Sequence, residues 1–329
     1  MDRGIFMAVN ADKPERWKAD IAQSVDMYNN WFIQFAPRAY RDSRVETVQL
    51  VKLAFLWTNN LLAIHTEVLR EHPTLLPILR MATAPPLARD RLVGLAGVER
   101  HLVESMEIHG QLPPRMAYTV VSEQLQKICQ VIMRLIDKEI CIWLERNQPP
   151  DEVELYRAST IIADRLCGAV TDPIIRNAQE RRQLMILSSW LDMHGYTQLS
   201  TEGRVRMRAM QPGTYAFRLN VPVTQENGQG QQRQVNMPVD AVVKPRYADA
   251  EELPLLIEAK SAGDFTNPNK RRKEEATKVA QLYRQYGSQV HFILFLCGYF
   301  DSGYLGYEAA EGIDWVWEHR VDDLVLFGV

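Results

Sequence analysis

The chain has 329 residues, a formal net charge of −3 at pH 7 and the apolar and charged content of an ordinary folded protein. This length is enough for two domains, and the small net charge excludes a protein that attracts nucleic acid through a global basic field. A local basic groove stays possible, because carboxylates elsewhere on the chain can offset its charge.

The cysteines predict reduced thiols in the core. They show no C-x-x-C pairing, and each lies among apolar residues: Cys129, Cys141, Cys167 and Cys297. The sequence also shows no signal peptide and no apolar run long enough to cross a membrane. We therefore expect a protein of a reducing cytoplasm with no membrane partner.

The first part of the chain has the pattern of helices. From residue 14 to residue 36, apolar side chains recur every three or four positions, and Pro37 is expected to end this helix. Further helices are expected at residues 42–62 and 122–146, with two more between residues 151 and 194 that separate at Pro173. The clearest linker is Gln148-Pro149-Pro150, so we divide the chain into regions 1–150 and 151–329.

The pattern changes to strands after Gly195. Residues 214–221 alternate, which predicts a strand with Tyr215, Phe217, Leu219 and Val221 on one side. A hairpin loop at residues 225–230, a helix at 270–286 and a buried strand at 291–297 complete the pattern. The fold class is therefore α/β or α+β, with a large helical region before the strands.

Two apolar runs between residues 236 and 260 carry the candidate chemistry. Asp240 lies in the first run, and the second run ends in Glu258-Ala259-Lys260. Side chains alternate across a strand, so Glu258 and Lys260 point to one face, with their Cα atoms about 6.6 Å apart. If the two strands pair, Asp240 reaches the same face. Two carboxylates then hold a divalent cation, and the lysine orients water or stabilises charge on a phosphate.

The alternative for this segment is a hairpin whose charged residues lie on a solvated face. Two observations argue against it. Glu258 directly follows Leu255, Leu256 and Ile257, where an unpaired carboxylate is costly, and the chain just beyond Lys260 is strongly basic.

Side chains that follow Lys260 in the sequence are candidates for binding phosphates. The residues Lys270, Arg271, Arg272 and Lys273 open a predicted helix, and the amides of Asn267 and Asn269 precede them. A basic cluster at a helix start opposes the helix dipole, which a bound phosphate would compensate; a solvated helix face is the alternative. Glu180 in a preceding helix is a candidate further carboxylate, with plain helix surface as its alternative.

The C-terminal tail interleaves aromatic and acidic residues from Tyr299 to Trp317. This composition is compatible with reading base edges and with an oligomer interface.

The chain resembles the XamI-type restriction endonucleases over nearly its whole length. The resemblance is carried by NADKPERWKADIAQSVDMYNNWFIQFAP, PPLARDRLVGLAGV, LLIEAKSAGDFTNPNKRRKEEATKVAQL and FLCGYFDSGYLGYEAAEGIDWVWEHRVDDL. It implies a bacterial type II restriction enzyme with a mixed-sheet PD-(D/E)xK core that cuts double-stranded DNA with Mg²⁺ at a palindrome of the GTCGAC kind. It also implies that Asp240, Glu258 and Lys260 are the catalytic residues, with Glu180 as the accompanying helix glutamate.

A palindrome presents the same bases twice, so we expect a homodimer with one metal site in each subunit. The region 1–150 would then embrace the DNA or form the dimer. The rival interpretations are a repair or structure-specific nuclease and a nucleic-acid-binding protein that has kept the scaffold without the chemistry.

Overall fold

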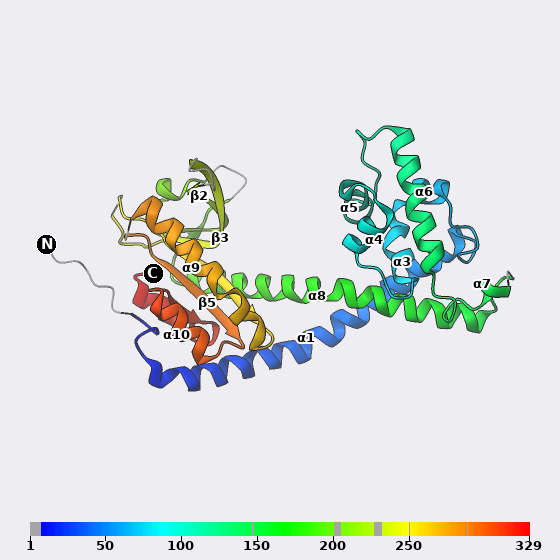
Figure 1. Ribbon diagram of the computed structural model, residues 1–329. Coiled ribbons are helices and arrows are strands. Elements are labelled where there is room, and N and C mark those ends of the chain that lie inside the picture. Colours follow the sequence, from blue (N-terminus) through cyan, green and yellow to red (C-terminus); the bar gives the residue numbers. More distant parts are fainter. Residues whose placement is uncertain (1–7, 147, 201–204, 227–231, 250, 288) are drawn as a thin grey trace. The chain divides into compact units, whose positions relative to one another are not determined.

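The computed structural model describes residues 8–146, 148–200, 205–226, 232–249, 251–287 and 289–329, and the backbone alone at positions 170, 226, 267 and 269–272. It combines helices with one mixed six-stranded sheet, which confirms the α+β class (Figure 1). The helices are α1 (Pro14–Trp57), α2 (Thr66–Glu71), α3 (Leu76–Met81), α4 (Arg89–Ala96), α5 (Arg100–Ile108), α6 (Tyr118–Leu135), α7 (Trp143–Arg146), α8 (Glu152–Met193), α9 (Thr266–Tyr286) and α10 (Ser302–Ala310). The strands are β1 (Thr197–Gln198), β2 (Thr214–Glu226), β3 (Gln232–Lys244), β4 (Leu255–Ala262), β5 (Phe292–Gly298) and β6 (Asp314–Trp317).

The chain forms two compact units. One contains Met1–Phe35 and Arg176–Val329, and the other contains Ala36–Ile175. One boundary between the units falls inside α1 and the other inside α8. The linker expected at residue 150 lies directly before the first turn of α8. Proline is tolerated at a helix start, which explains why Pro149 and Pro150 precede a helix without separating compact units. The functional roles of regions 1–150 and 151–329 stay a prediction.

Pro37 and Pro173 both lie inside long helices, so the predicted helix ends at these positions are wrong. A proline inside a helix costs about 3 kcal/mol, because it removes one hydrogen bond and crowds the preceding turn. The segments on each side of Pro37 bury apolar residues, including Tyr28 before it and Val51 and Phe55 after it. Packing of this kind is what stabilises helices in proteins, and it offsets the local cost.

The helical unit has its own hydrophobic core. In α6, the buried side chains recur at helical spacing, namely Val121, Leu125, Ile128 and Ile132. The indole of Trp143 is fully buried and meets the ring of Phe55 edge to face, at a centroid distance of 5.9 Å. The helix predicted at residues 122–146 is present as far as Leu135, and its continuation beyond that residue is wrong, because the backbone leaves the helical region at Ile136, where ψ is 137°.

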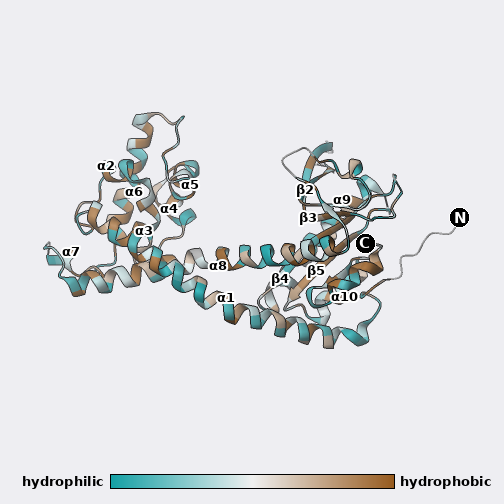
Figure 2. Ribbon diagram, turned by 180° about the vertical axis from the view of Figure 1, so that it is seen from behind, coloured by the Kyte–Doolittle hydropathy of each residue, from teal (hydrophilic) through white to brown (hydrophobic). Residues whose placement is uncertain are grey.

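The sheet has the strand order β1-β2-β3-β4-β5-β6. Strand β3 is antiparallel to both of its neighbours, β2 and β4, whereas β4, β5 and β6 are parallel. The C-terminal part of α8 packs on one face, and α9 and α10 pack on the other. Both faces of β5 are therefore covered, which explains why every residue of this strand is buried and why it is coloured as hydrophobic in Figure 2.

The long hairpin of β2 and β3 changes faces at Arg218 and Asp240. In β2, Tyr215 and Phe217 pack on the α8 side, whereas Leu219 and Val221 pack on the α9 side. Uninterrupted alternation would place all four on one face, so that prediction is wrong. Arg218 has a φ of +52°, and the regular register steps over it, from Phe217↔Ala241 to Leu219↔Val239. This irregular backbone reverses the faces of the residues that follow.

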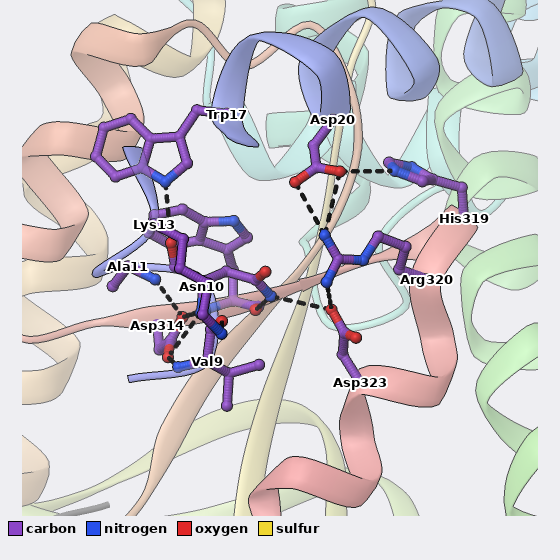
Figure 3. Close-up of polar contacts among 11 residues, drawn as sticks. Val9, Asn10, Ala11, Lys13, Trp17, Asp20, Asp314, His319, Arg320 and Asp323 are labelled. Carbon is purple, nitrogen blue, oxygen red and sulfur yellow. Dashed lines mark hydrogen bonds and ion pairs between the residues drawn. The ribbon is translucent and has the colours of Figure 1, made fainter. Parts of the chain in front are cut away.

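The N-terminal end of the described chain is fixed to the first residue of β6 (Figure 3). The Asp314 carboxylate accepts hydrogen bonds from three consecutive backbone N–H groups, those of Val9, Asn10 and Ala11. Close by, Arg320 pairs with Asp20 of α1 and with Asp323. These contacts hold the beginning of α1 against the sheet.

The aromatic tail is largely core. Trp315 and Trp317 are fully buried in β6, and Tyr304 is buried in α10. These side chains are therefore unavailable for base edges or for an oligomer interface. The four cysteines are buried free thiols, as predicted. No helix in the described ranges is long and apolar enough to cross a membrane.

Candidate active site

The candidate site lies where β3 stops pairing with β4. The two strands pair over only three positions, from Ala241↔Ile257 to Val243↔Leu255. Asp240 is the next residue of β3, and its Oδ2 accepts a hydrogen bond from the Ala259 N–H at 2.9 Å. The carboxylate thus takes a backbone donor of β4 at the point where the ladder between the strands ends.

Glu258 and Lys260 share one face of β4, as the alternation predicted. The Lys260 Nζ lies 3.4 Å from Oε1 of Glu258, and the Lys278 Nζ of α9 lies 2.5 Å from the same oxygen. Glu258 is only 6% exposed. Its other oxygen, Oε2, has no hydrogen-bond partner in the part of the chain that the structure describes.

Glu275 of α9 completes the surroundings of Lys260. Its Oε1 lies 2.7 Å from the Lys260 Nζ, and the residue is 2% exposed. Neither Glu275 nor Lys278 was among the site residues predicted from the sequence. A signal was present, because Glu275 occupies a position on the inward helix stripe that it shares with the buried Val279 and Leu282.

The charges of this cluster shift its titration. Burial, the nearby Glu258 and the more distant charge of Glu180 raise the pKa of Asp240 to about 6, although the Ala259 N–H opposes the change. Burial lowers the pKa of Lys260, but the Glu258 and Glu275 carboxylates outweigh that effect and raise it overall. Lys260 is therefore an ammonium group in this state, and it donates hydrogen bonds to both glutamates.

Another buried carboxylate, that of Glu308, lies near Glu275. Glu308 of α10 is fully buried beside Tyr304, and burial together with the charge of Glu275 raises its pKa to about 8. At neutral pH this group is mostly protonated, so it adds little negative charge to the site.

Glu180 comes from the face of the sheet that α8 covers, opposite to α9. It belongs to α8, and its Oε1 accepts a hydrogen bond from Nη2 of Arg218 at 2.8 Å. Arg218 is the β2 residue with positive φ, and by register it stands across from Asp240. Glu180 therefore has a partner that the sequence did not indicate, and its charge still acts on Asp240.

The basic cluster belongs to the first half of α9. Lys273 is exposed there. The side chains of Asn267, Asn269, Lys270, Arg271 and Arg272 lie outside the described part of the structure, so only their place in the helix is known.

The carboxylates of this site fit a hard divalent cation. Asp240 and Glu258 would supply oxygen ligands, and the partnerless Oε2 of Glu258 is a buried acceptor that a cation would satisfy. Within the described ranges, no three acidic, histidine or cysteine side chains form a complete metal cage. Mg²⁺ is usually bound by one or two carboxylates, with water and substrate phosphates as the remaining ligands.

Comparison with known proteins agrees with this chemistry. The family model of the XamI restriction endonuclease matches residues 59–317. The chain is also 52% identical to the type II restriction enzyme SalI of Streptomyces albus G over 320 residues, which cover 97% of this chain and 99% of that enzyme. Protein VC1899 of Vibrio cholerae, of known crystal structure, aligns with 78% of this chain and 54% of its own at 13% identity and a TM-score of 0.27, a likeness that carries no argument.

This result decides between the interpretations that the sequence left open. A repair nuclease and a scaffold without chemistry are both set aside, because the match covers most of the chain and the similarity to the restriction enzyme nearly all of it. The chain belongs to the XamI restriction endonuclease family and is a type II restriction endonuclease, a hydrolase that cleaves DNA.

Proposed function

We propose that Asp240 and Glu258 hold Mg²⁺, and that Lys260 acts beside them as the enzyme breaks both strands of DNA at a palindrome of the GTCGAC kind. Type II restriction enzymes generally need a divalent metal ion, and the class of ligands present here favours Mg²⁺. The observation that carries the proposal is the free Oε2 of Glu258, a buried oxygen next to Asp240 with no donor among the described residues.

Each residue has a distinct role in this scheme. When bound, Mg²⁺ polarises the scissile phosphate and stabilises the leaving oxygen. Asp240 is held by the Ala259 N–H, and Glu258 is held through Oε1 by Lys260 and Lys278, so both carboxylates are oriented before DNA arrives. Such orientation lowers the cost of assembling the reacting groups.

Lys260 is the cation that faces the reacting phosphate. Its ammonium group orients the attacking water or stabilises the charge that develops on the phosphate. Glu275 fixes its position, because a contact of 2.7 Å from a rigid helix restricts a long and flexible side chain. Glu180 belongs to the same catalytic constellation, and its contribution is to the charge around Asp240.

The first half of α9 is the proposed phosphate-binding surface. Lys270, Arg271, Arg272 and Lys273 contact the DNA backbone, and Asn267 and Asn269 donate to phosphates or base edges. The support is their sequence at the start of a helix, where backbone N–H groups also favour anions, together with the exposure of Lys273.

The enzyme is proposed to act as a homodimer in the bacterial cytoplasm. A two-fold dimer matches the symmetry of a palindrome and brings two metal sites to the two strands. Exposed apolar side chains on α1 support an interface there, namely Val45, Leu50, Leu53 and Leu56. Light scattering with and without duplex tests the assembly, and a protein that stays monomeric on DNA and nicks the strands separately contradicts it.

The experiment for the function is cleavage followed by sequencing of the ends. Plasmid DNA is incubated with the enzyme and Mg²⁺, and the expected result is a set of discrete fragments whose ends share one palindrome. Calorimetric titration of Mg²⁺ into the wild type and Asp240→Asn supplies a readout independent of turnover. Equal Mg²⁺ affinity in the two proteins would show that the metal is held elsewhere.

A further inference from the structure

We propose that Arg218 is a DNA-phosphate ligand at the cleavage site, and that Glu180 holds its guanidinium there until a phosphate takes the place of the glutamate. This inference rests on the proposed function, since it assigns the side of the active site opposite α9. Glu180 thereby gains a positioning role, because it orients Arg218 in the free enzyme.

The backbone at Arg218 is the first observation. Arginine rarely adopts positive φ, and a residue held in that region costs of the order of 1 kcal/mol or more. Arg218 adopts it in the middle of a strand, where glycine would fit without strain. Strained residues of this kind are concentrated at functional sites. The sequence nevertheless places a long cationic side chain at this position.

The place of the strained residue is the second observation. The register of β2 and β3 sets Arg218 across from Asp240, at the point where both strands change faces. Because the faces reverse at this point, the side chain of Arg218 does not follow the alternation of its neighbours Phe217 and Leu219. The side chain reaches Glu180 of α8, with 2.8 Å between Nη2 and Oε1. The guanidinium is thus anchored beside a proposed metal ligand.

The state of the side chain is the third observation. Arg218 is 65% exposed at its side chain, and its contact with Glu180 joins Nη2 to one carboxylate oxygen. A guanidinium has five N–H donors, so others remain for a phosphate. Exposed ion pairs contribute little, whereas a bidentate contact between arginine and phosphate is strong and directional. Exchange of Glu180 for a phosphate is therefore favourable.

The distribution of positive charge completes the argument. Lys260 lies beside α9 and Lys278 belongs to it; both are engaged with Glu258, and Lys260 also contacts Glu275. On the α8 side, Glu180 adds a negative charge beyond the two carboxylates proposed to hold Mg²⁺, and this charge would repel an incoming phosphate unless a cation lay beside it. Arg218 is a cation that the described part of the structure places beside Glu180.

The test is the salt dependence of DNA binding in Ca²⁺, measured by fluorescence anisotropy on a cognate and an unrelated duplex. For Arg218→Ala we expect affinity to fall about tenfold on both duplexes and the log–log salt slope to decrease by ~1. Single-turnover cleavage with Mg²⁺ should fall about 100-fold, as when one positioned donor is removed from a transition state. Arg218→Lys should keep the salt slope but recover little cleavage, because a lysine lacks the bidentate fork.

Further variants separate charge from backbone strain. Arg218→Gly removes the strain, so it should melt at or above the wild-type temperature and still lose the salt slope. Arg246→Ala is the control, since Arg246 is also exposed and its Nη1 donates a hydrogen bond to the backbone carbonyl of His194. An unchanged slope in both Arg218→Ala and Arg218→Gly overturns the proposal and leaves Arg218 with a purely structural role.

Glu180→Gln tests the exchange itself. Removal of the competing carboxylate should leave the salt slope unchanged and should not weaken binding. A loss of affinity as large as that of Arg218→Ala would contradict exchange, because Glu180 would then be needed in the complex. Asp240→Asn keeps the two proposals apart. If this variant cuts normally, the metal site is wrong; if it is inactive while Arg218→Ala binds normally, only the role of Arg218 is wrong.

Discussion

Two carboxylates in the same sheet have opposite surroundings. Asp314 opens β6, and both of its oxygens accept hydrogen bonds from the backbone N–H groups of the N-terminal segment, with Trp315 donating as well. Glu258 lies in β4, where one oxygen meets two lysines and the other has no partner among the described residues. The first carboxylate is saturated by its own chain, and the second is not.

This difference distinguishes a carboxylate that orders the fold from one that can bind a ligand. A saturated carboxylate has no acceptor left for a ligand, so its value is the ordering of the segment that it binds. A buried oxygen without a donor costs the free energy of its lost hydration. Such a cost persists where function requires it, and perturbed titration at the neighbouring Asp240 is a further sign of a functional site.

The largest effect is expected from the metal and water site. Asp240→Asn and Lys260→Ala should each lower the single-turnover cleavage rate by about 1,000-fold or more, because they remove a ligand or a charge used in the transition state. Thermal melting at pH 7.5 should stay level or rise for Asp240→Asn, since burial opposes ionisation of the native side chain. Normal cutting by either variant would remove the assignment.

Glu275→Gln should have the next largest effect. It keeps the shape of the side chain but removes the charge that holds the Lys260 Nζ at 2.7 Å. We expect DNA binding in Ca²⁺ to be unchanged and cleavage to fall by about 10- to 100-fold, because a mispositioned group weakens catalysis at close range. The control is Glu274→Gln on the exposed side of α9, which should cut normally. Loss of binding together with cleavage in Glu275→Gln would indicate a folding defect instead.

The alternation of β4 was enough to predict part of this site. A period of two places Glu258 and Lys260 on one face whatever the rest of the chain does, and the structure has them there. The lysine's other partner could not be predicted in the same way. The contact between Glu275 and Lys260 depends on how α9 lies over β4, which is set by packing between distant segments.

The predictions that the structure contradicts were wrong for local physical reasons. The faces of β2 were predicted by continuing one alternation through Arg218, and a single residue at positive φ reversed them. The helix ends at Pro37 and Pro173 were predicted from the cost of proline, and the packing of the flanking segments outweighed it. Local propensity decides an element only where tertiary packing does not oppose it.

Asp314→Asn tests whether the Asp314 carboxylate contributes to stability and not to cleavage. The amide presents an NH₂ group to backbone donors, so at least one hydrogen bond of the N-terminal segment is lost. We expect the free energy of unfolding to fall by about 1–3 kcal/mol. Cleavage per folded molecule, measured well below the melting temperature, should be unchanged. A variant of normal stability with reduced cleavage would make this carboxylate functional and would end the contrast with Glu258.

Glu308 gives the smallest expected effect, and it is one of pH. Its folded pKa of about 8 lies above the ordinary value of 4.5. The folded state therefore binds the proton more tightly, and the stabilisation is complete below pH 4.5 and is lost as the pH rises through about 8. Between pH 7 and pH 9 the native protein should lose about 1 kcal/mol that Glu308→Gln does not lose, which corresponds to about 2 °C in melting temperature. Melting curves of both proteins at the two pH values measure this difference. If both proteins lose the same stability between the two pH values, Glu308 is already ionised in the folded protein. The buried acids around Lys260 would then carry one more negative charge than a protonated Glu308 gives them.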